Sequence, residues 1–301
     1  MVEDNSTVTL YASVIIPVYN AEDVLGECIE SIINLDYPKD KLEIIFIDNN
    51  SEDKSFDLLK KYKGEVRVLT ENKRGPAAAR NKGIENAHGE IIAFTDADCK
   101  VNSDWLKNLI KPLIEDRGIG ATGGKILAKR PCNSIEKYGE IIHDHNRAIN
   151  LYNIPYLITM NMAIRKSCLM EVNMFDEDLI GGEDTDLSYR LNAAGCKFKY
   201  APEAIVFHKN ERSLSGLFKE GFLHGFWYIR LKMKRNRTLS KIQGKEVFGI
   251  YIKITFKYIL SLLKILFLRK KDKFSLYDKI FRSGKEIGKF SCAILHKYLS
   301  T

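Results

Sequence analysis

The chain has 301 residues, of which 45% are hydrophobic and 29% are charged, and it contains no internal repeat or low-complexity segment. This composition excludes a low-complexity chain and is typical of a globular protein with one large domain, or one domain with an appendage. The formal net charge of +8 is unevenly spread, because residues 212–301 carry a net +16 and residues 1–211 a net −8. Such an asymmetry indicates an acidic partner for the basic part, either anionic lipid or nucleic acid.

The cysteines and the amino terminus both bear on the cellular compartment. The six cysteines are scattered, with no C-x-x-C pair and no zinc-ligand spacing, which favours a reduced compartment. The segment Met1–Asn5 is acidic and polar, unlike the start of a secretory signal peptide. We therefore expect a cytoplasmic protein.

The first hundred residues alternate short apolar strands with helical patterns. The expected strands are 14–18, 42–47, 66–69 and 91–94, and the expected helices between them are 21–33, 54–62 and 76–87. Strict alternation of this kind predicts an α/β fold with a mostly parallel sheet and helices on both faces. Ligands of such sheets bind at the carboxyl ends of the strands.

An Asp-x-Asp pair, Asp96 and Asp98, follows the expected strand 91–94. Side chains at i and i+2 of a strand point to the same face, so we expect the two carboxylates to leave the strand tip together. Hard cations such as Mg²⁺ take carboxylate oxygens and keep positions open for substrate phosphates. The pair therefore indicates a metal-bound nucleotide, although a solvated turn leading into the next helix would have the same sequence.

Six motifs occur in order and at the spacing of a known family, and together they cover about residues 12–210. The motifs are Val14–Ala21, Ile47–Asp53, Gly75–Asn81, Asp96–Asp98, Asn161–Arg165 and Gly182–Leu187. In these motifs the chain resembles glycosyltransferase family 2. The resemblance implies a GT-A fold, which binds a nucleotide-diphosphosugar, and sugar transfer with inversion at the anomeric carbon.

The resemblance also implies which residues hold the nucleotide. Pro17, Tyr19 and Asn20 at the first strand tip, together with Asp48, should hold the base and ribose. Asp48 would accept a hydrogen bond from the base, a contact that discriminates between bases because an unpaired buried group is costly. Arg80 would contact the base edge or the pyrophosphate, since its fork of donors suits either. The alternative for Arg80 is a solvated arginine on a helix face.

A metal site is implied in the same way. Asp96 should lie near the ribose and the metal, and Asp98 should bind Mn²⁺ or Mg²⁺ directly. His208, which follows the apolar segment 204–207, stands where family members often carry a third metal ligand. The alternative is a structural histidine after a strand. A metal here would neutralise the charge that builds on the departing diphosphate.

Inverting transfer requires one base to take the proton from the acceptor hydroxyl. The segment Gly181–Asp184 fits this role, with Asp184 as our choice of base and Glu183 as the reserve. A carboxylate suffices, and its pKa rises when it is partly buried near other carboxylates. The alternative is that both acids only stabilise the start of the helix expected over 185–194, because acidic residues are favourable at a helix amino terminus.

The basic C-terminal part extends beyond the resemblance. Residues 216–237 interleave aromatic and basic side chains, and residues 251–268 form an apolar helical pattern with a narrow lysine stripe. Three lysines inside that helix argue against a bilayer span and favour a position in the membrane interface. The alternative is a helix packed on the catalytic domain. Many relatives act on polyprenyl-phosphate carriers or growing glycans at the cytoplasmic leaflet, which would give the basic region a purpose.

These observations predict a GT-A catalytic domain over residues 1–211, with a donor-binding half at about 12–100 and an acceptor half at about 101–211. Residues 212–301 form a basic, amphipathic helical region that contacts anionic membrane peripherally. The expected activity is metal-assisted, inverting sugar transfer to a glycan or lipid-linked acceptor, as in polysaccharide biosynthesis. A sugar nucleotidyltransferase is an alternative, but the Gly-rich, Arg-containing loop that such enzymes carry after the first strand is missing. A nucleic-acid-binding protein is a second alternative, which the acidic first part opposes.

Overall fold

The computed structural model describes residues 9–235 and 273–299. The strands are β1 (Ala12–Val18), β2 (Leu42–Asp48), β3 (Arg67–Thr70), β4 (Ile91–Phe94), β5 (Lys100–Val101), β6 (Ile119–Ala128), β7 (Met162–Arg165) and β8 (Lys197–His208). The α-helices are α1 (Glu22–Ile33), α2 (Ser55–Lys60), α3 (Pro76–Asn86), α4 (Trp105–Glu115), α5 (Ser134–Ile142), α6 (His145–Asn150), α7 (Lys166–Glu171), α8 (Glu183–Ala193), α9 (Leu214–Arg235) and α11 (Lys273–Leu299). Two short 3₁₀ helices are η1 (Lys39–Lys41) and η2 (Thr159–Asn161).

The chain divides by its internal contacts into two compact units. The first comprises residues up to 129 together with 143–209, and the second comprises 130–142 together with the residues from 210 onward. The segment 130–142, which carries α5, therefore joins the C-terminal helices although it interrupts the first unit in sequence. We describe each unit separately.

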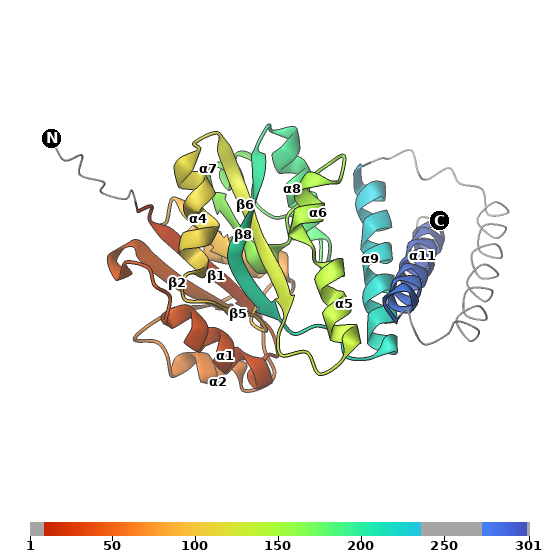
Figure 1. Cartoon of the computed structure of the whole chain (residues 1–301), viewed down its shortest axis with the longest axis horizontal. Coiled ribbons are helices and arrows are strands. Elements are labelled where there is room, and N and C mark those ends of the chain that lie inside the picture. Colours follow the sequence, from red (N-terminus) through yellow and green to blue (C-terminus); the bar gives the residue numbers. More distant parts are fainter. Residues whose placement is uncertain (1–8, 236–272, 300–301) are drawn as a thin grey trace. The chain divides into compact units, whose positions relative to one another are not determined.

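The first unit is built on one sheet of eight strands, in the order β3-β2-β1-β4-β7-β6-β8-β5. The pairs β1–β2, β1–β4, β2–β3 and β6–β8 are parallel, and the pairs that involve β7 or β5 are antiparallel. Figure 1 shows β6 and β8 crossing the unit side by side. The four strands expected in the first hundred residues are confirmed, with ends that differ by at most two residues.

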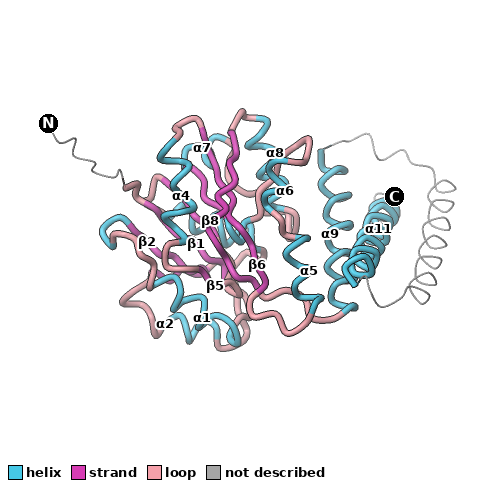
Figure 2. Tube along the Cα trace, viewed as in Figure 1, coloured by secondary structure: helices cyan, strands magenta, loops and turns pink. Residues whose placement is uncertain are grey.

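Helices cover both faces of the sheet, as predicted, because consecutive strand residues alternate between two apolar cores (Figure 2). In β1, Val14 and Ile16 join the core that also holds Leu25 of α1 and Trp105 of α4. Ile15, between them, joins the opposite core, beside side chains of α3 and α8. All three β1 residues are fully buried, which is typical of a strand with a covered face on each side.

The second unit contains the helices α5, α9 and α11, so the predicted C-terminal helical region is confirmed. Buried aromatic and aliphatic side chains join the three helices: Tyr138, Leu217, Tyr277 and Ile280. The lysine-striped helix expected over 251–268 lies outside the described residues. Within the described ranges we find no helix long and apolar enough to cross a membrane.

Glycines bring α9 and α11 into backbone contact. Gly221 and Gly225 on α9 lie four residues apart, as do Gly284 and Gly288 on α11. A Cβ at any of the four would overlap a backbone carbonyl of the opposite helix. Residues at i and i+4 share a helix face, so each helix offers a groove without side chains to its partner. Figure 1 shows the two helices lying side by side.

Replacing Gly225 by alanine is expected to destabilise the second unit. The new Cβ would collide with the carbonyl of Lys285, which is backbone and cannot move aside, and such overpacking costs about 1–3 kcal/mol. Gly26→Ala is the matched control, because Gly26 lies inside α1 with nothing within 4 Å of its Cβ position. That change should be neutral or stabilising by up to ~1 kcal/mol. Thermal unfolding followed by circular dichroism measures the stability of both variants. A melting temperature of Gly225→Ala equal to that of the wild type would contradict the glycine contact.

Candidate active site

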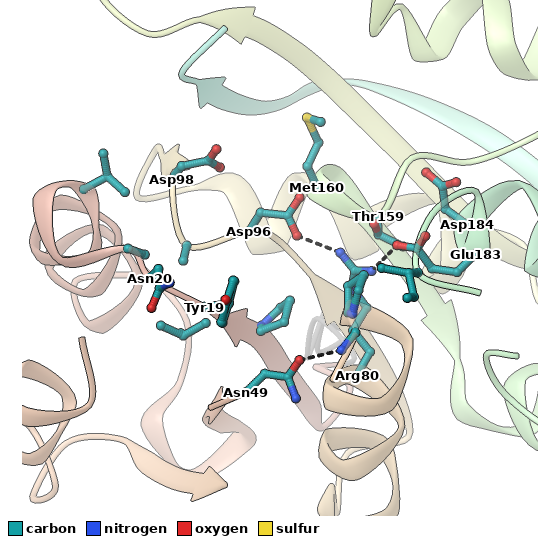
Figure 3. A pocket seen from close by; sticks show the side chains of 18 of the residues that line it. Tyr19, Asn20, Asn49, Arg80, Asp96, Asp98, Thr159, Met160, Glu183 and Asp184 are labelled. Atoms are coloured by element: carbon teal, nitrogen blue, oxygen red, sulfur yellow. Dashed lines mark hydrogen bonds and ion pairs between the residues drawn. The ribbon is translucent and has the colours of Figure 1, made fainter. Parts of the chain in front are cut away.

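A pocket of about 830 Å³ opens in the first unit at the carboxyl ends of β1, β2 and β4. Most of the residues predicted for the site line it, namely Pro17, Tyr19, Asn20, Arg80, Asp96, Asp98, Glu183 and Asp184. The other two are adjacent to lining residues: Asp48 precedes Asn49, and His208 precedes Lys209. The strand-tip location therefore brings together segments from five parts of the sequence, and Figure 3 shows their side chains.

Arg80 bridges two walls of this pocket. Its Nη2 lies 2.8 Å from Asp96 Oδ1, and its Nη1 lies 2.8 Å from Glu183 Oε1. The side chain is only 4% exposed, so both ion pairs are shielded from solvent. Burial acts to lower the pKa of the guanidinium, but the two carboxylates outweigh it and raise the pKa. Arg80 is thus a fixed cation that joins the end of β4 to the start of α8 (Figure 3).

The start of α3 sets the position of Arg80. Gly75 precedes the helix with a φ of 124°, a conformation that favours glycine, and Pro76 occupies the first helical position. The Gly75 N–H donates to Asn49 Oδ1 at 2.8 Å, and the Asn49 amide donates to two carbonyls of the same loop. Asn49 therefore anchors this loop on the end of β2.

Glu183 and Asp184 occupy the first turn of α8, which begins two residues earlier than expected. Gly182 precedes them in the left-handed conformation, with a φ of 73°. Burial raises the pKa of the Asp184 carboxyl to about 7; the charge of Glu183 acts in the same direction, and Arg80 and the hydrogen bonds from Thr185 oppose it. The adjacent acids thus have different environments, because Glu183 forms an ion pair with Arg80, whereas Asp184 forms none with any residue that the structure describes.

Asp96 and Asp98 both line the pocket, but their carboxylates have different partners. The strand β4 ends at Phe94, and the chain then turns, with the Cys99 N–H donating to the Asp96 carbonyl at 3.0 Å. The rule that i and i+2 share a face holds only while the strand continues. Asp96 consequently faces Arg80, and Asp98 lies on the other side of Asp96 from Arg80 (Figure 3).

Asp98 contacts His208, the last residue of β8. The distance between His208 Nε2 and Asp98 Oδ2 is 3.3 Å, and the Asp98 side chain is 36% exposed. Burial acts to raise the pKa of Asp98, but the hydrogen bond and charge of His208 outweigh it and lower the pKa. A carboxylate oxygen and an imidazole nitrogen at a pocket wall are a donor set that Mn²⁺ accepts and that Mg²⁺ accepts in part.

Asp48 is buried at the end of β2, and only one of its two carboxylate oxygens accepts a hydrogen bond from the described residues. Its Oδ2 accepts from the Ser51 N–H at 3.3 Å, and its Oδ1 is buried with no hydrogen-bond partner among the described residues. A buried acceptor without a donor is costly unless a ligand or water supplies one. Asp48 therefore offers an acceptor at the position predicted for base recognition.

One wall of the pocket, formed by residues 158–160, was not predicted to belong to the site. His145 fixes it: its Nε2 accepts from the Ile158 N–H at 2.6 Å, and its Nδ1–H donates to the Gly124 carbonyl at 2.8 Å. Burial lowers the pKa of His145 to about 4, so the ring is neutral as this arrangement requires. No local pattern marked the wall, because a buried histidine 13 residues away positions it.

The prediction also missed further side chains that line the pocket, among them Arg74, Ile180 and Lys209. Arg74 and Ile180 lie in loops without a recognisable pattern. Lys209 could have been found from its place directly after His208.

Comparisons with known proteins agree with this geometry. The model of glycosyl transferase family 2 matches residues 13–172. Over 247 residues the chain is 29% identical to glycosyltransferase AglE of Haloferax volcanii, with 80% of this chain and 78% of AglE covered. It is 26% identical over 235 residues to dolichyl N-acetyl-alpha-D-glucosaminyl phosphate 3-beta-D-2,3-diacetamido-2,3-dideoxy-beta-D-glucuronosyltransferase of Methanococcus voltae, with coverage of 71% and 72%.

A solved structure has the same fold. Mannosyltransferase PcManGT from Pyrobaculum calidifontis, in complex with GDP-Man and Mn²⁺, superposes with a TM-score of 0.64 at 20% identity. The alignment covers 98% of this chain and 89% of that one. The chain therefore belongs to glycosyl transferase family 2, and it is a glycosyltransferase of the GT-A fold that uses a nucleotide-sugar donor.

Proposed function

We propose that the protein is an inverting, metal-assisted glycosyltransferase that moves a sugar from a nucleotide-diphosphosugar to a hydroxyl of a glycan or lipid-linked acceptor. The observation that carries this proposal is the environment of Asp184. Its pKa of about 7 lies near neutral pH, where a carboxylate is both ionised in part and able to hold a proton. Asp184 is therefore the general base; burial, and after it the negative charge of Glu183, raises its pKa.

The reaction follows from that role. Asp184 takes the proton of the acceptor hydroxyl while the oxygen attacks the anomeric carbon on the face opposite the diphosphate. The bond between the anomeric carbon and the diphosphate oxygen breaks, and its electron pair leaves with the nucleoside diphosphate. Attack from the opposite face inverts the anomeric centre. Arg80 supports this step indirectly, since it holds Glu183 in place beside the base.

The nucleotide would bind at the tips of β1 and β2. Tyr19, Asn20 and Pro17 would border the base and ribose, and Asp48 Oδ1 would accept a hydrogen bond from the base. Arg80 Nε has no partner among the described residues, so this N–H is the donor that Arg80 still offers to a ligand.

Asp98 and His208 would hold Mn²⁺ or Mg²⁺, with Asp96 nearby, because their oxygen and nitrogen donors lie together at the pocket wall. When bound, the metal supplies positive charge for the diphosphate.

A peripheral contact with anionic membrane would bring the enzyme to its acceptor. The name of the Methanococcus voltae relative contains a dolichyl-linked sugar phosphate, which supports a lipid-linked acceptor here. The second unit would make the contact, since residues 212–301 carry a net +16 and α9 ends in Lys232, Lys234 and Arg235. We propose that the protein acts at the cytoplasmic face of the membrane.

Asp184→Asn should lower kcat by about 10²–10⁴-fold, because the amide cannot take the proton, and should leave donor affinity nearly unchanged. In the wild-type enzyme kcat/KM should rise with pH through about 7 and then level off, since only ionised Asp184 acts. Steady-state kinetics from pH 5.5 to 9, together with calorimetric donor binding, measures both.

Glu183→Gln is the matched control for the base. It removes the negative charge beside Asp184, so the pH midpoint of the remaining activity should move to lower pH. If Glu183→Gln abolished turnover with intact donor binding while Asp184→Asn stayed active, the base would be Glu183.

The raised pKa also predicts a pH-dependent stability. The folded state favours protonated Asp184, so wild-type stability should fall relative to Asp184→Asn as pH rises from 3.8 to about 7. The expected difference is about 1–4 kcal/mol at pH 8. Parallel melting curves at pH 5 and pH 8 measure it, and a constant difference would argue against the raised pKa.

Asp98→Asn should abolish the metal-dependent increase in melting temperature, because it removes a charged metal ligand. The measurement is thermal unfolding with UDP, GDP or TDP, with and without Mn²⁺. Asp104→Asn serves as control, since Asp104 is an exposed carboxylate six residues further on. An unchanged Mn²⁺ effect in Asp98→Asn would remove Asp98 from the metal site.

Membrane contact predicts co-sedimentation with phosphatidylglycerol vesicles, but not with phosphatidylcholine vesicles, and release by high salt. The double substitution Lys232→Glu and Lys234→Glu should weaken it, by about 30-fold if each lysine contributes ~1 kcal/mol. The control is Lys61→Glu with Lys63→Glu, two exposed lysines of the first unit. Equal losses in the two double variants would contradict a contact through α9.

A further inference from the structure

Three cationic side chains line the pocket, and two of them already have carboxylate partners. Arg74 Nη2 lies 2.6 Å from Glu52 Oε1, and Arg80 is held by Asp96 and Glu183. The third is Lys209, which is exposed. Among the residues that the structure describes, none forms a hydrogen bond or ion pair with its ammonium group. Among the described residues, Lys209 is therefore the pocket cation without a carboxylate partner.

Lys209 lies next to the proposed metal ligands in the chain. It directly follows His208, the end of β8, and His208 contacts Asp98. Its side chain thus starts beside the residues proposed to hold the metal. The pocket also exposes four carboxylates, those of Asp96, Asp98, Glu183 and Asp184. An anionic ligand in such surroundings needs positive charge, and Arg74 and Arg80 are already engaged.

We propose that Lys209 binds the diphosphate of the nucleotide-sugar donor and stabilises it as the leaving group; this inference rests on the proposed function. When the bond to the anomeric carbon breaks, its electron pair stays on the oxygen of the outer phosphate, which gains negative charge. An ammonium group with three donors can bind that phosphate before and after the bond breaks. Lys209 acts in the reaction through this charge and exchanges no proton.

The test compares nucleoside diphosphates with monophosphates, because only the former carry the outer phosphate. Calorimetric titration of UDP, GDP and TDP, and of UMP, GMP and TMP, identifies the nucleotide that the wild-type protein binds. Lys209→Met should weaken binding of that diphosphate by about 10-fold and change the affinity for its monophosphate by less than about 2-fold. Lys209→Arg keeps the charge and should retain most of the affinity.

Lys199→Met is the matched control, because Lys199 is an exposed lysine of β8, the strand that Lys209 directly follows, and lies outside the pocket lining. It should bind both nucleotides like the wild type. For the matching nucleotide-sugar, Lys209→Met should lower kcat/KM by at least the factor lost in diphosphate affinity. Melting curves should be unchanged in all three variants, since both lysines are exposed.

Two outcomes overturn the inference alone: wild-type diphosphate affinity in Lys209→Met, or an equal loss of affinity for the diphosphate and the monophosphate. A wild-type protein that binds none of the three diphosphates would instead overturn the proposed function, and this inference with it.

Discussion

The buried ion pairs of Arg80 are the interaction on which the site depends. Asp96 follows β4 and Glu183 opens α8, so one guanidinium joins segments that lie 87 positions apart in the sequence. Glu183 is buried and Asp96 is half-buried, so without Arg80 the Glu183 carboxylate would be an uncompensated buried charge, which costs about 3–5 kcal/mol in comparable cases. The pocket therefore keeps its shape only while α3, β4 and α8 hold their relative positions. Asn49 and Gly75 extend this constraint to β2, because they fix the start of α3.

The same ion pairs separate the properties of two adjacent acids. Glu183 forms an ion pair with Arg80, and its negative charge also raises the pKa of the neighbouring Asp184. Asp184 is half-buried at the start of α8, and this burial is the main reason why its pKa lies near 7 and not in the acidic range usual for aspartate. One arginine thereby gives neighbouring carboxylates different tasks, one as a structural anion and one as a candidate base.

The sequence predicted what depends on local pattern and missed what depends on distant contacts. The apolar run at residues 14–18 predicted the first strand, the alternation of strands with helices predicted the two covered faces, and the strand tips predicted most of the pocket. The different partners of Asp96 and Asp98, Arg80 and His208, could not be predicted, because both partners lie far from this motif in the sequence. The contact of Gly225 with α11 was missed for a similar reason. A glycine spaced four residues from another is a common pattern, and only the opposite helix gives it a function.

The distribution of charge along the chain fits the different functions that we propose for the two units. Base chemistry and metal binding need carboxylates, and these make the lining of the pocket acidic. Attraction to an anionic membrane needs the opposite charge. One surface of mixed sign would weaken both tasks, since the lysines would pair with the catalytic acids and the acids would repel the membrane. In this chain 21 of the 47 lysines and arginines lie in residues 212–301, with only 5 acidic residues among them. Arg74 and Arg80 of the pocket are already paired with carboxylates, which is why we propose Lys209, together with the proposed metal ion, as the source of positive charge for the donor diphosphate.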